Sequence, residues 1–274
     1  MNERTTPDRP TLAVHKFSSC DGCQLAFLNL GEALVELARL FDIRHFAEAG
    51  VLDEEAPVDI AFVEGSVSVS EDIARLRRIR ERSGFLVAIG ACATTGGIQA
   101  LRRLHDLDAL RGAVYPRPEW IASLAHATPL SRHVKVDLEL GGCPVDAGQV
   151  LTALGDLRAG VRPRACTEPL CQQCKRRGVA CVMVTAGEPC LGPVTRGGCG
   201  ALCPALGRAC YACYGPVSEP NGTALETRFA ALGLDAAARA RRFRYLHSGV
   251  AAFESTAQRA LREGAEPTGG DDGR

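Results

Sequence analysis

The chain has 274 residues, of which 46% are hydrophobic and 23% are charged, a composition that excludes a disordered chain. Its 32 basic residues balance 32 acidic residues, so the charge gives no reason to expect nucleic acid as a partner. The sequence contains no run of 18 apolar residues, and we expect no transmembrane segment. Because the polar start MNERTTPDRP carries no export signal, we expect a cytoplasmic protein.

The first 160 residues alternate strand-like and helix-like segments. We predict strands at 11–17, 41–46, 58–63, 85–89 and 134–138, and helices at 24–40, 68–82 and 146–157. Ser68 and Glu71 fit a capping box for the second of these helices, and Gly84 is placed to end it. This alternation predicts an α/β fold, a flavodoxin-like doubly wound parallel sheet.

The chain contains 13 cysteines, and they are unevenly distributed. Four lie within the first 150 residues, and nine lie between Cys166 and Cys213. In a reducing cytoplasm so many thiols are metal ligands or redox groups more often than disulfides. We therefore predict a flavodoxin-like domain at 1–160, a small cysteine-rich, ferredoxin-like iron–sulfur domain at 161–220, and C-terminal helices with a disordered tail at 221–274. The C-terminal helices are predicted at 224–244 and 251–262, and the tail at 264–274.

The first four cysteines follow predicted strands. Cys20 and Cys23 come after the first strand, Cys92 after the fourth and Cys143 after the fifth. Since ligands bind beyond the carboxyl ends of the strands in open α/β sheets, we expect these thiols to converge. Four thiolates suit a zinc ion or a four-iron cluster, and their origin in three separate loops favours iron–sulfur. The alternative is that Cys92 and Cys143 are only small buried residues.

Glu64 ends the third predicted strand at the same edge of the sheet. It is either a solvated or capping carboxylate or a proton-handling group beside a cluster. The sequence leaves both interpretations open.

The second group of cysteines supplies eight further thiols, enough for two four-iron clusters. These are Cys171, Cys174, Cys181, Cys190, Cys199, Cys203, Cys210 and Cys213. No histidine occurs between His133 and His247, so the pattern indicates ligation by cysteine alone. Zinc ribbons also use paired C-x2-C motifs and are the competing interpretation. Cys166 is then a spare thiol.

Several short motifs together resemble the small, electron-transferring subunit of nickel–iron hydrogenases. They are SCDGC at 19–23, VEG at 63–65, GACATTGGI at 90–98, GCP at 142–144, PCLGP at 189–193, GCG at 198–200 and CYGP at 213–216. The likeness is strongest to cytoplasmic, NAD(P)-linked enzymes of the sulfhydrogenase delta-subunit type. It extends to the related 20 kDa subunit family of NADH:quinone oxidoreductase.

This resemblance implies three 4Fe–4S clusters. The proximal cluster would be held by Cys20, Cys23, Cys92 and Cys143, a second by Cys171, Cys174, Cys181 and Cys190, and a third by Cys199, Cys203, Cys210 and Cys213. Nothing in the sequence resembles the paired cysteine motifs by which the large subunit binds nickel, so we expect no nickel site in this chain. The loop after the first strand lacks the phosphate loop of a flavodoxin, and the glycines at 90–97 lack the lysine and the spacing of nucleotide-binding loops, so we expect no flavin or nucleotide. Val145 departs from the family pattern, because many relatives have a second proline there.

The implied function is an electron relay. The chain would pass electrons between a nickel–iron large subunit and flavin- or NAD(P)-binding and ferredoxin-like reductase subunits. One alternative is a subunit of an NADH:quinone-oxidoreductase-like complex, against which the nine additional cysteines argue. The other alternative is an interaction protein whose fold is stabilised by structural zinc.

Overall fold

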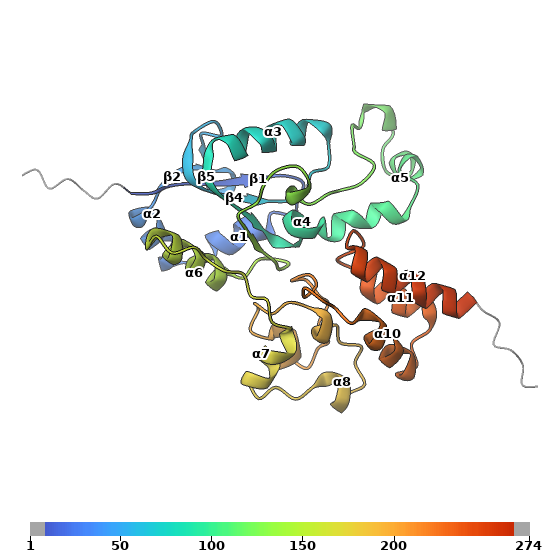
Figure 1. Ribbon diagram of the computed structural model, residues 1–274. Helices are drawn as coiled ribbons and strands as arrows, with labels where there is room; N and C mark the ends of the chain where they lie inside the picture. The colour runs from blue at the N-terminus through green and yellow to red at the C-terminus, as the bar shows by residue number, and fades with distance from the viewer. Residues whose placement is uncertain (1–8, 266–274) are drawn as a thin grey trace, which may run out of the picture.

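A six-stranded sheet forms the centre of the N-terminal part of this computed structural model, which describes residues 9–265 (Figure 1). Its strands are β1 (Thr11–Lys16), β2 (Asp42–Phe46), β3 (Val51–Leu52), β4 (Val58–Glu64), β5 (Ser83–Ile89) and β6 (Leu138–Leu140). They lie in the order β3-β2-β1-β4-β5-β6, and only β3 runs antiparallel to its neighbour. The parallel strands therefore have flavodoxin-like order, which confirms the predicted fold class.

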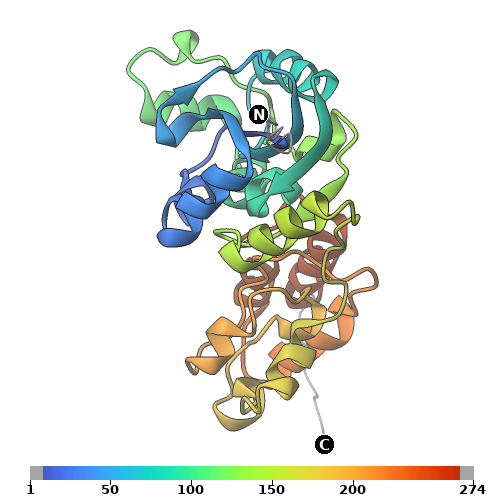
Figure 2. The same ribbon diagram turned by 90° about the vertical axis from the view of Figure 1, so that its left-hand side faces the viewer.

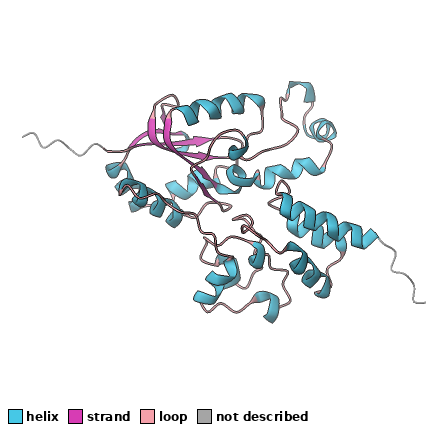
Figure 3. Cartoon of the chain, viewed as in Figure 1, coloured by secondary structure: helices cyan, strands magenta, loops and turns pink. Residues whose placement is uncertain are grey.

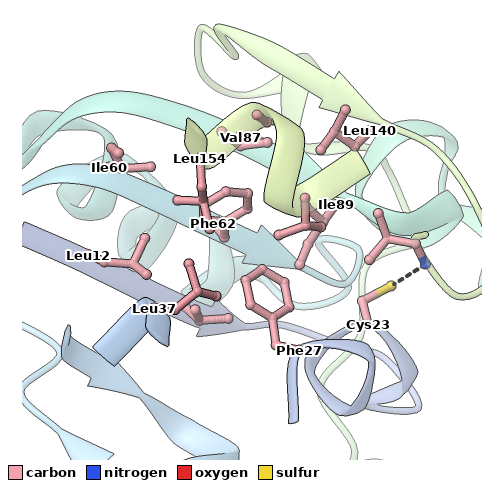
Figure 4. Packing of buried hydrophobic residues seen from close by; sticks show 14 of the residues in the cluster. Leu12, Cys23, Phe27, Leu37, Ile60, Phe62, Val87, Ile89, Leu140 and Leu154 are labelled. Atoms are coloured by element: carbon pink, nitrogen blue, oxygen red, sulfur yellow. Dashed lines mark hydrogen bonds between the residues drawn. The ribbon is translucent and has the colours of Figure 1, made fainter. Parts of the chain in front are cut away.

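Helices cover both faces of this sheet. On one face lie α1 (Gly22–Leu28), α2 (Glu32–Leu40) and α6 (Ala147–Arg158), and on the other lies α3 (Ser70–Glu81) (Figure 1). On the first face Phe27 packs edge-on against Phe62 of β4, with ring centroids 5.3 Å apart (Figure 4). Burying a side chain of this size contributes about 1.5–3 kcal/mol. The two apolar layers fix the sheet and therefore the loops at its carboxyl edge.

The remaining elements are short or C-terminal, and within residues 9–265 all strands belong to the one sheet and lie before residue 141 (Figure 3). They are η1 (Ala47–Ala49), α4 (Gly90–Thr95), η2 (Gly97–Leu104), α5 (Leu107–Val114), η3 (Pro118–Trp120), η4 (Leu130–Arg132), α7 (Leu170–Arg176), α8 (Val182–Thr185), η5 (Gly192–Val194), α9 (Leu202–Ala205), α10 (Gly222–Ala231), α11 (Ala236–Arg244) and α12 (Ala251–Ala265). None of the helices within residues 9–265 combines the length and hydrophobicity needed to cross a bilayer.

The cysteine-rich segment and the C-terminal helices lie together below the sheet (Figure 2). Leu191 and Val194 of the cysteine-rich segment share a buried cluster with Phe229, Phe243 and Phe253 of α10–α12. The cysteine-rich segment therefore does not rely on metal alone for its packing. The domain limits at 160 and 220 remain predictions.

The structure corrects several element boundaries. The predicted strand 134–138 is wrong except for its last residue, because β6 pairs with β5 only from Leu138 onward. Val134 and Val136 do contact the core, but outside any strand. The predicted helix 24–40 is two helices separated at 29–31, and the predicted helix 224–244 is divided between α10 and α11.

The start of α3 and the end of the chain also differ from expectation. The carboxylate of Asp72, not that of Glu71, accepts hydrogen bonds from the backbone N–H groups of Ser68 (2.9 Å) and Val69 (3.1 Å). Gly84 lies in β5 and does not end α3. Helix α12 includes residues 264 and 265, and the rest of the predicted tail, 266–274, lies outside the described residues.

Candidate functional site

The first four cysteines meet at the carboxyl edge of the sheet. Cys20 lies in the loop after β1, Cys23 in the first turn of α1, Cys92 in α4 directly after β5, and Cys143 in the loop between β6 and α6. Cys23 is buried, whereas Cys20 and Cys143 are exposed. The predicted convergence is therefore present in the fold, with one side of the group open to the surface.

Backbone surrounds the buried thiol of Cys23. The N–H of Val145 donates to its Sγ at 3.4 Å, so the β6–α6 loop reaches back to the first cysteine pair (Figure 4). The backbone of Gly90 also lies against this thiol, because a Cβ at position 90 would come within 2.4 Å of the Cys23 Sγ. With its φ of +83°, Gly90 occupies a region that side chains disfavour, so glycine is required there on both grounds.

Glu64 is 2% exposed and lies against the same cysteine pair. Its carboxylate accepts hydrogen bonds from the backbone N–H groups of Cys23 (3.2 Å) and Gln24 (3.0 Å), at the start of α1. Burial raises the pKa of this carboxyl, and the two amide donors oppose the rise. These contacts are those of a helix-capping carboxylate, and the proton-handling role stays a prediction.

The pKa values of these thiols show that the site disfavours the charged thiolate form. Burial, together with the thiols of Cys143 and Cys20, raises the pKa of Cys92 to about 12. Burial likewise raises the pKa of Cys23 and of Cys143. Thiolates at such positions need a compensating cation, and a metal centre supplies one.

The second group of thiols comes from the first half of the cysteine-rich segment, residues 171–190. A Cβ on Gly192 would lie 3.4 Å from the Sγ of Cys190 and 3.6 Å from that of Cys171, so these two thiols flank one point. Burial, followed by the thiols of Cys190, Cys174 and Cys181, raises the pKa of Cys171 to about 11. Cys171, Cys174, Cys181 and Cys190 therefore lie within electrostatic reach of one another.

The third group lines a cavity. Its four thiols, with that of Cys143, border about 260 Å³, far more than the roughly 30 Å³ that one water molecule occupies in the liquid. The four are Cys199, Cys203, Cys210 and Cys213. The N–H of Ala212 donates to the Sγ of Cys210 at 3.3 Å, and the N–H of Cys210 donates to the Sγ of Cys190 at 3.2 Å. The cavity therefore lies between the first and second groups of thiols.

Backbone joins the first group to the third. The N–H of Gly142 donates to the carbonyl of Cys213 at 3.1 Å. Burial raises the pKa of the Cys213 thiol, and the backbone N–H of Cys143 opposes this rise. Cys166 lies outside all three groups, with its Sγ 4.0 Å from the carbonyl of Glu168.

These donors fit iron–sulfur clusters in chemical type. Each group offers four thiols, backbone N–H groups point at sulfur, and the third group encloses space. Within residues 9–265, no group of three or more His, Cys, Asp and Glu side chains is arranged to hold a single metal ion. A cluster has a different requirement, because its iron and sulfide atoms lie between the thiolates and hold them farther apart.

Sequence reasoning missed the backbone donors. The N–H groups of Val145 and Ala212 have no side-chain signature in the sequence. The only available signal was their position within two residues of a cysteine.

Comparison with known proteins places the chain in a family. Residues 20–157 match the family described as NADH ubiquinone oxidoreductase, 20 Kd subunit. The chain is 37% identical over 210 residues to sulfhydrogenase 2 subunit delta of Pyrococcus furiosus, a match that covers 77% of this chain and 88% of that protein. It is 28% identical over 264 residues to one subunit of the F420-non-reducing hydrogenase vhu of Methanococcus voltae, with 84% of this chain and 91% of that protein covered.

A solved structure agrees with these relatives. A chain of the NAD+-reducing NiFe-hydrogenase in the H2-reduced state matches with a TM-score of 0.53 and 30% identity, covering 57% of this chain and 94% of that chain. These similarities favour neither of the two alternative functions. The chain belongs to the NADH ubiquinone oxidoreductase 20 kDa subunit family, among its hydrogenase small and delta subunits.

Proposed function

We propose that this chain is the electron-relay subunit of a cytoplasmic nickel–iron hydrogenase and that it binds three 4Fe–4S clusters. The observation that carries the proposal is the succession of three cysteine groups, with the third located between the other two. Such clusters supply one-electron storage when bound. Family membership supports the function, since the relatives are named as hydrogenase subunits.

Twelve cysteines are proposed as ligands. Cys20, Cys23, Cys92 and Cys143 would hold the proximal cluster, Cys171, Cys174, Cys181 and Cys190 a second, and Cys199, Cys203, Cys210 and Cys213 a third. The thiols of Cys143 and Cys20 act on Cys92, and those of Cys190, Cys174 and Cys181 act on Cys171, which supports the first two sets. The third set is supported by the cavity that its four residues line. The third group would hold the medial cluster of the relay, because it lies next to Cys143 on one side and Cys190 on the other.

The protein's own contribution is to position the thiols and set their environment. The N–H groups of Val145 and Ala212 donate to thiol sulfurs, and amide donors of this kind raise the reduction potential of a cluster. The hydrogen bond from the Gly142 N–H to the Cys213 carbonyl holds the loops of the first and third groups together. Fixed spacing suits electron transfer, because the distance between the two clusters would then stay constant.

The proposed partners are the subunits that would split hydrogen and reduce the final electron acceptor, two reactions that this chain would not carry out itself. Hydrogen would be split at nickel in a large subunit, and electrons would leave through the second cysteine group to a flavin- or NAD(P)-binding or ferredoxin-like reductase subunit. Cys20 and Cys143 are exposed in the first group and Cys181 is exposed in the second, which supports contact with a partner subunit at each end of the relay.

The experiment uses the purified complex and compares two activities. Exchange of deuterium gas with water requires only the large subunit, whereas hydrogen-dependent reduction of the acceptor requires the relay. Cys213→Ser should retain the exchange and lose at least tenfold in acceptor reduction, whereas Cys166→Ser should retain both. Full acceptor reduction in Cys213→Ser complexes that have lost the third cluster would contradict the proposal.

A further inference from the structure

A buried histidine from the C-terminal segment touches two of the three cysteine regions. His247 lies in the loop between α11 and α12 and is 1% exposed. Its Nε2 is 2.5 Å from the carbonyl oxygen of Ala212, between Cys210 and Cys213. Its Nδ1 is 2.8 Å from the hydroxyl of Thr95, in the same short helix as Cys92. One side chain therefore links the loop of the third group to a helix of the first.

The chemistry of the two partners fixes the direction of both hydrogen bonds. A carbonyl oxygen can only accept, so Nε2 carries the hydrogen and donates to Ala212. Burial lowers the pKa of His247 to about 4, so the ring is neutral at pH 7 and Nδ1 accepts from the Thr95 hydroxyl. The single hydroxyl hydrogen is shared between Nδ1 and the carbonyl oxygen of Ala91, which lies 2.8 Å from the same hydroxyl.

Ala212 is the residue whose conformation this contact supports. Its φ is +67°, in the left-handed region that residues with a Cβ rarely occupy. In this conformation its N–H points at the Sγ of Cys210 at 3.3 Å, while its carbonyl accepts from both His247 and the N–H of Gly215 (2.8 Å). The carbonyl and the N–H lie in adjacent peptide planes joined by the φ and ψ of Ala212, so holding the carbonyl restrains the backbone conformation that presents the N–H to Cys210.

The loop that carries His247 has little freedom of its own. The carbonyl of Ser248 accepts a hydrogen bond from Arg103 at 2.9 Å, and a Cβ on Gly249 would lie 3.2 Å from the carbonyl of Thr95. The ring of Phe253 lies edge-on to the imidazole, with centroids 5.7 Å apart. The imidazole is therefore held from the side of the sheet domain and from α12.

We propose that His247 is a positioning residue for the third cysteine group, holding the Ala212 N–H on the Cys210 sulfur and the Ala212 loop against the Cys92 helix. This inference rests on the proposed function, because its consequence concerns a cluster bound there. An N–H donor on a ligand sulfur raises the reduction potential of a cluster. Loss of the His247 contacts should therefore lower the reduction potential of a cluster bound by the third group.

The test is a redox titration of the purified complex, followed by electron paramagnetic resonance, with iron content and thermal unfolding measured on the same samples. His247→Phe should retain its iron and show a lower midpoint potential for one cluster, with the other two unchanged. His247→Gln should stay near the wild-type value, because the amide can still donate to Ala212. Thr95→Val removes the second contact, together with the hydroxyl's contacts to Ala91 and Gly97, and should give a smaller shift in the same direction.

Two further variants separate positioning from packing. Ala212→Gly in the His247→Phe background should restore part of the potential, since glycine adopts a positive φ without penalty. His133→Phe is the matched control, because His133 makes a similar 2.8 Å contact with Thr128 in a loop that carries none of the cysteines. It should leave all three potentials unchanged.

Unchanged potentials in both His247→Phe and Thr95→Val, or an equal fall in His247→Gln, would overturn the inference. If His247→Phe fails to assemble, Thr95→Val and His247→Gln still decide between these outcomes. A wild-type complex without reducible clusters would instead contradict the proposed function, so the two failures are distinguishable.

Discussion

The backbone N–H of Gly142 donates a 3.1 Å hydrogen bond to the carbonyl of Cys213, which joins the loop of the proximal cysteines to the loop of the third group. Gly142 has a φ of +119°, and a Cβ there would lie 2.5 Å from the carbonyl oxygen of Pro144. The link therefore depends on glycine at this position.

Gly142→Ala should disturb two cysteine groups at once. We expect a loss of roughly 1–3 kcal/mol in stability from the backbone conformation, with further loss from the contact with Pro144. Thermal unfolding and iron content of the purified complex provide the measurement. Gly112→Ala, in α5 with open space around it, should instead be neutral or stabilising by about 0.5–1 kcal/mol. Equal stability of the two variants would show that the Gly142 backbone is not strained by a side chain.

Cys210→Ser should remove one cluster and destabilise the cysteine-rich segment, because metal binding supplies folding free energy there. We expect iron to fall from about twelve to about eight atoms per chain and the melting temperature to fall by roughly 5–10 °C. Cys166→Ser is the control and should change neither, since this thiol lies outside the three groups. Iron loss in Cys166→Ser, or full iron in Cys210→Ser, would contradict the proposed ligand set.

Asp72→Ala should destabilise the start of α3 by about 1 kcal/mol, because its carboxylate accepts from the N–H groups of Ser68 and Val69. Glu71→Ala, one residue earlier, should change stability by less than about 0.5 kcal/mol. Chemical denaturation of both variants checks this difference. A larger loss of stability in Glu71→Ala than in Asp72→Ala would contradict the observed cap and favour the capping box expected from the sequence.

The buried histidine His15 should make the protein sensitive to acid. Burial, then the charges of His45 and Arg75, lowers its pKa from 6.5 to about 3, so the folded state keeps this ring neutral. Below pH 6.5 the unfolded chain binds a proton that the folded chain does not, so stability falls as pH falls toward 3. The slope due to this group is about 1.4 kcal/mol per pH unit.

His15→Phe should therefore show a shallower loss of stability between pH 6.5 and 4 than the wild type. The ring stacks on that of His45 at 4.6 Å, and phenylalanine preserves this packing. Melting temperatures measured across this range test the expectation, with exposed His105→Gln as the control. Parallel curves for His15→Phe and wild type would assign the acid sensitivity to other groups.

The sheet was predictable from the sequence because its central strands are continuous apolar runs buried on both faces, as in β4. The last strand was not, because Leu138–Leu140 is short and the valines before it also contact the core without pairing. The division between α1 and α2 was missed because apolar spacing continues across the break, through Leu34 and Leu37.

The meeting of Cys20, Cys23, Cys92 and Cys143 followed from topology alone, because each follows a strand of one parallel sheet. The contacts around them could not be predicted. The Cys213–Gly142 link and the Ala212 donor belong to the backbone, and His247 reaches them from a C-terminal segment whose sequence indicated only helices.

The most direct test of the relay is the metal content and reducibility of the anaerobically purified complex. We predict about twelve iron and twelve acid-labile sulfide atoms in this chain, without zinc, and cluster signals in electron paramagnetic resonance after reduction with dithionite. Zinc in place of iron, or a complex that stays spectroscopically silent on reduction, would contradict the relay.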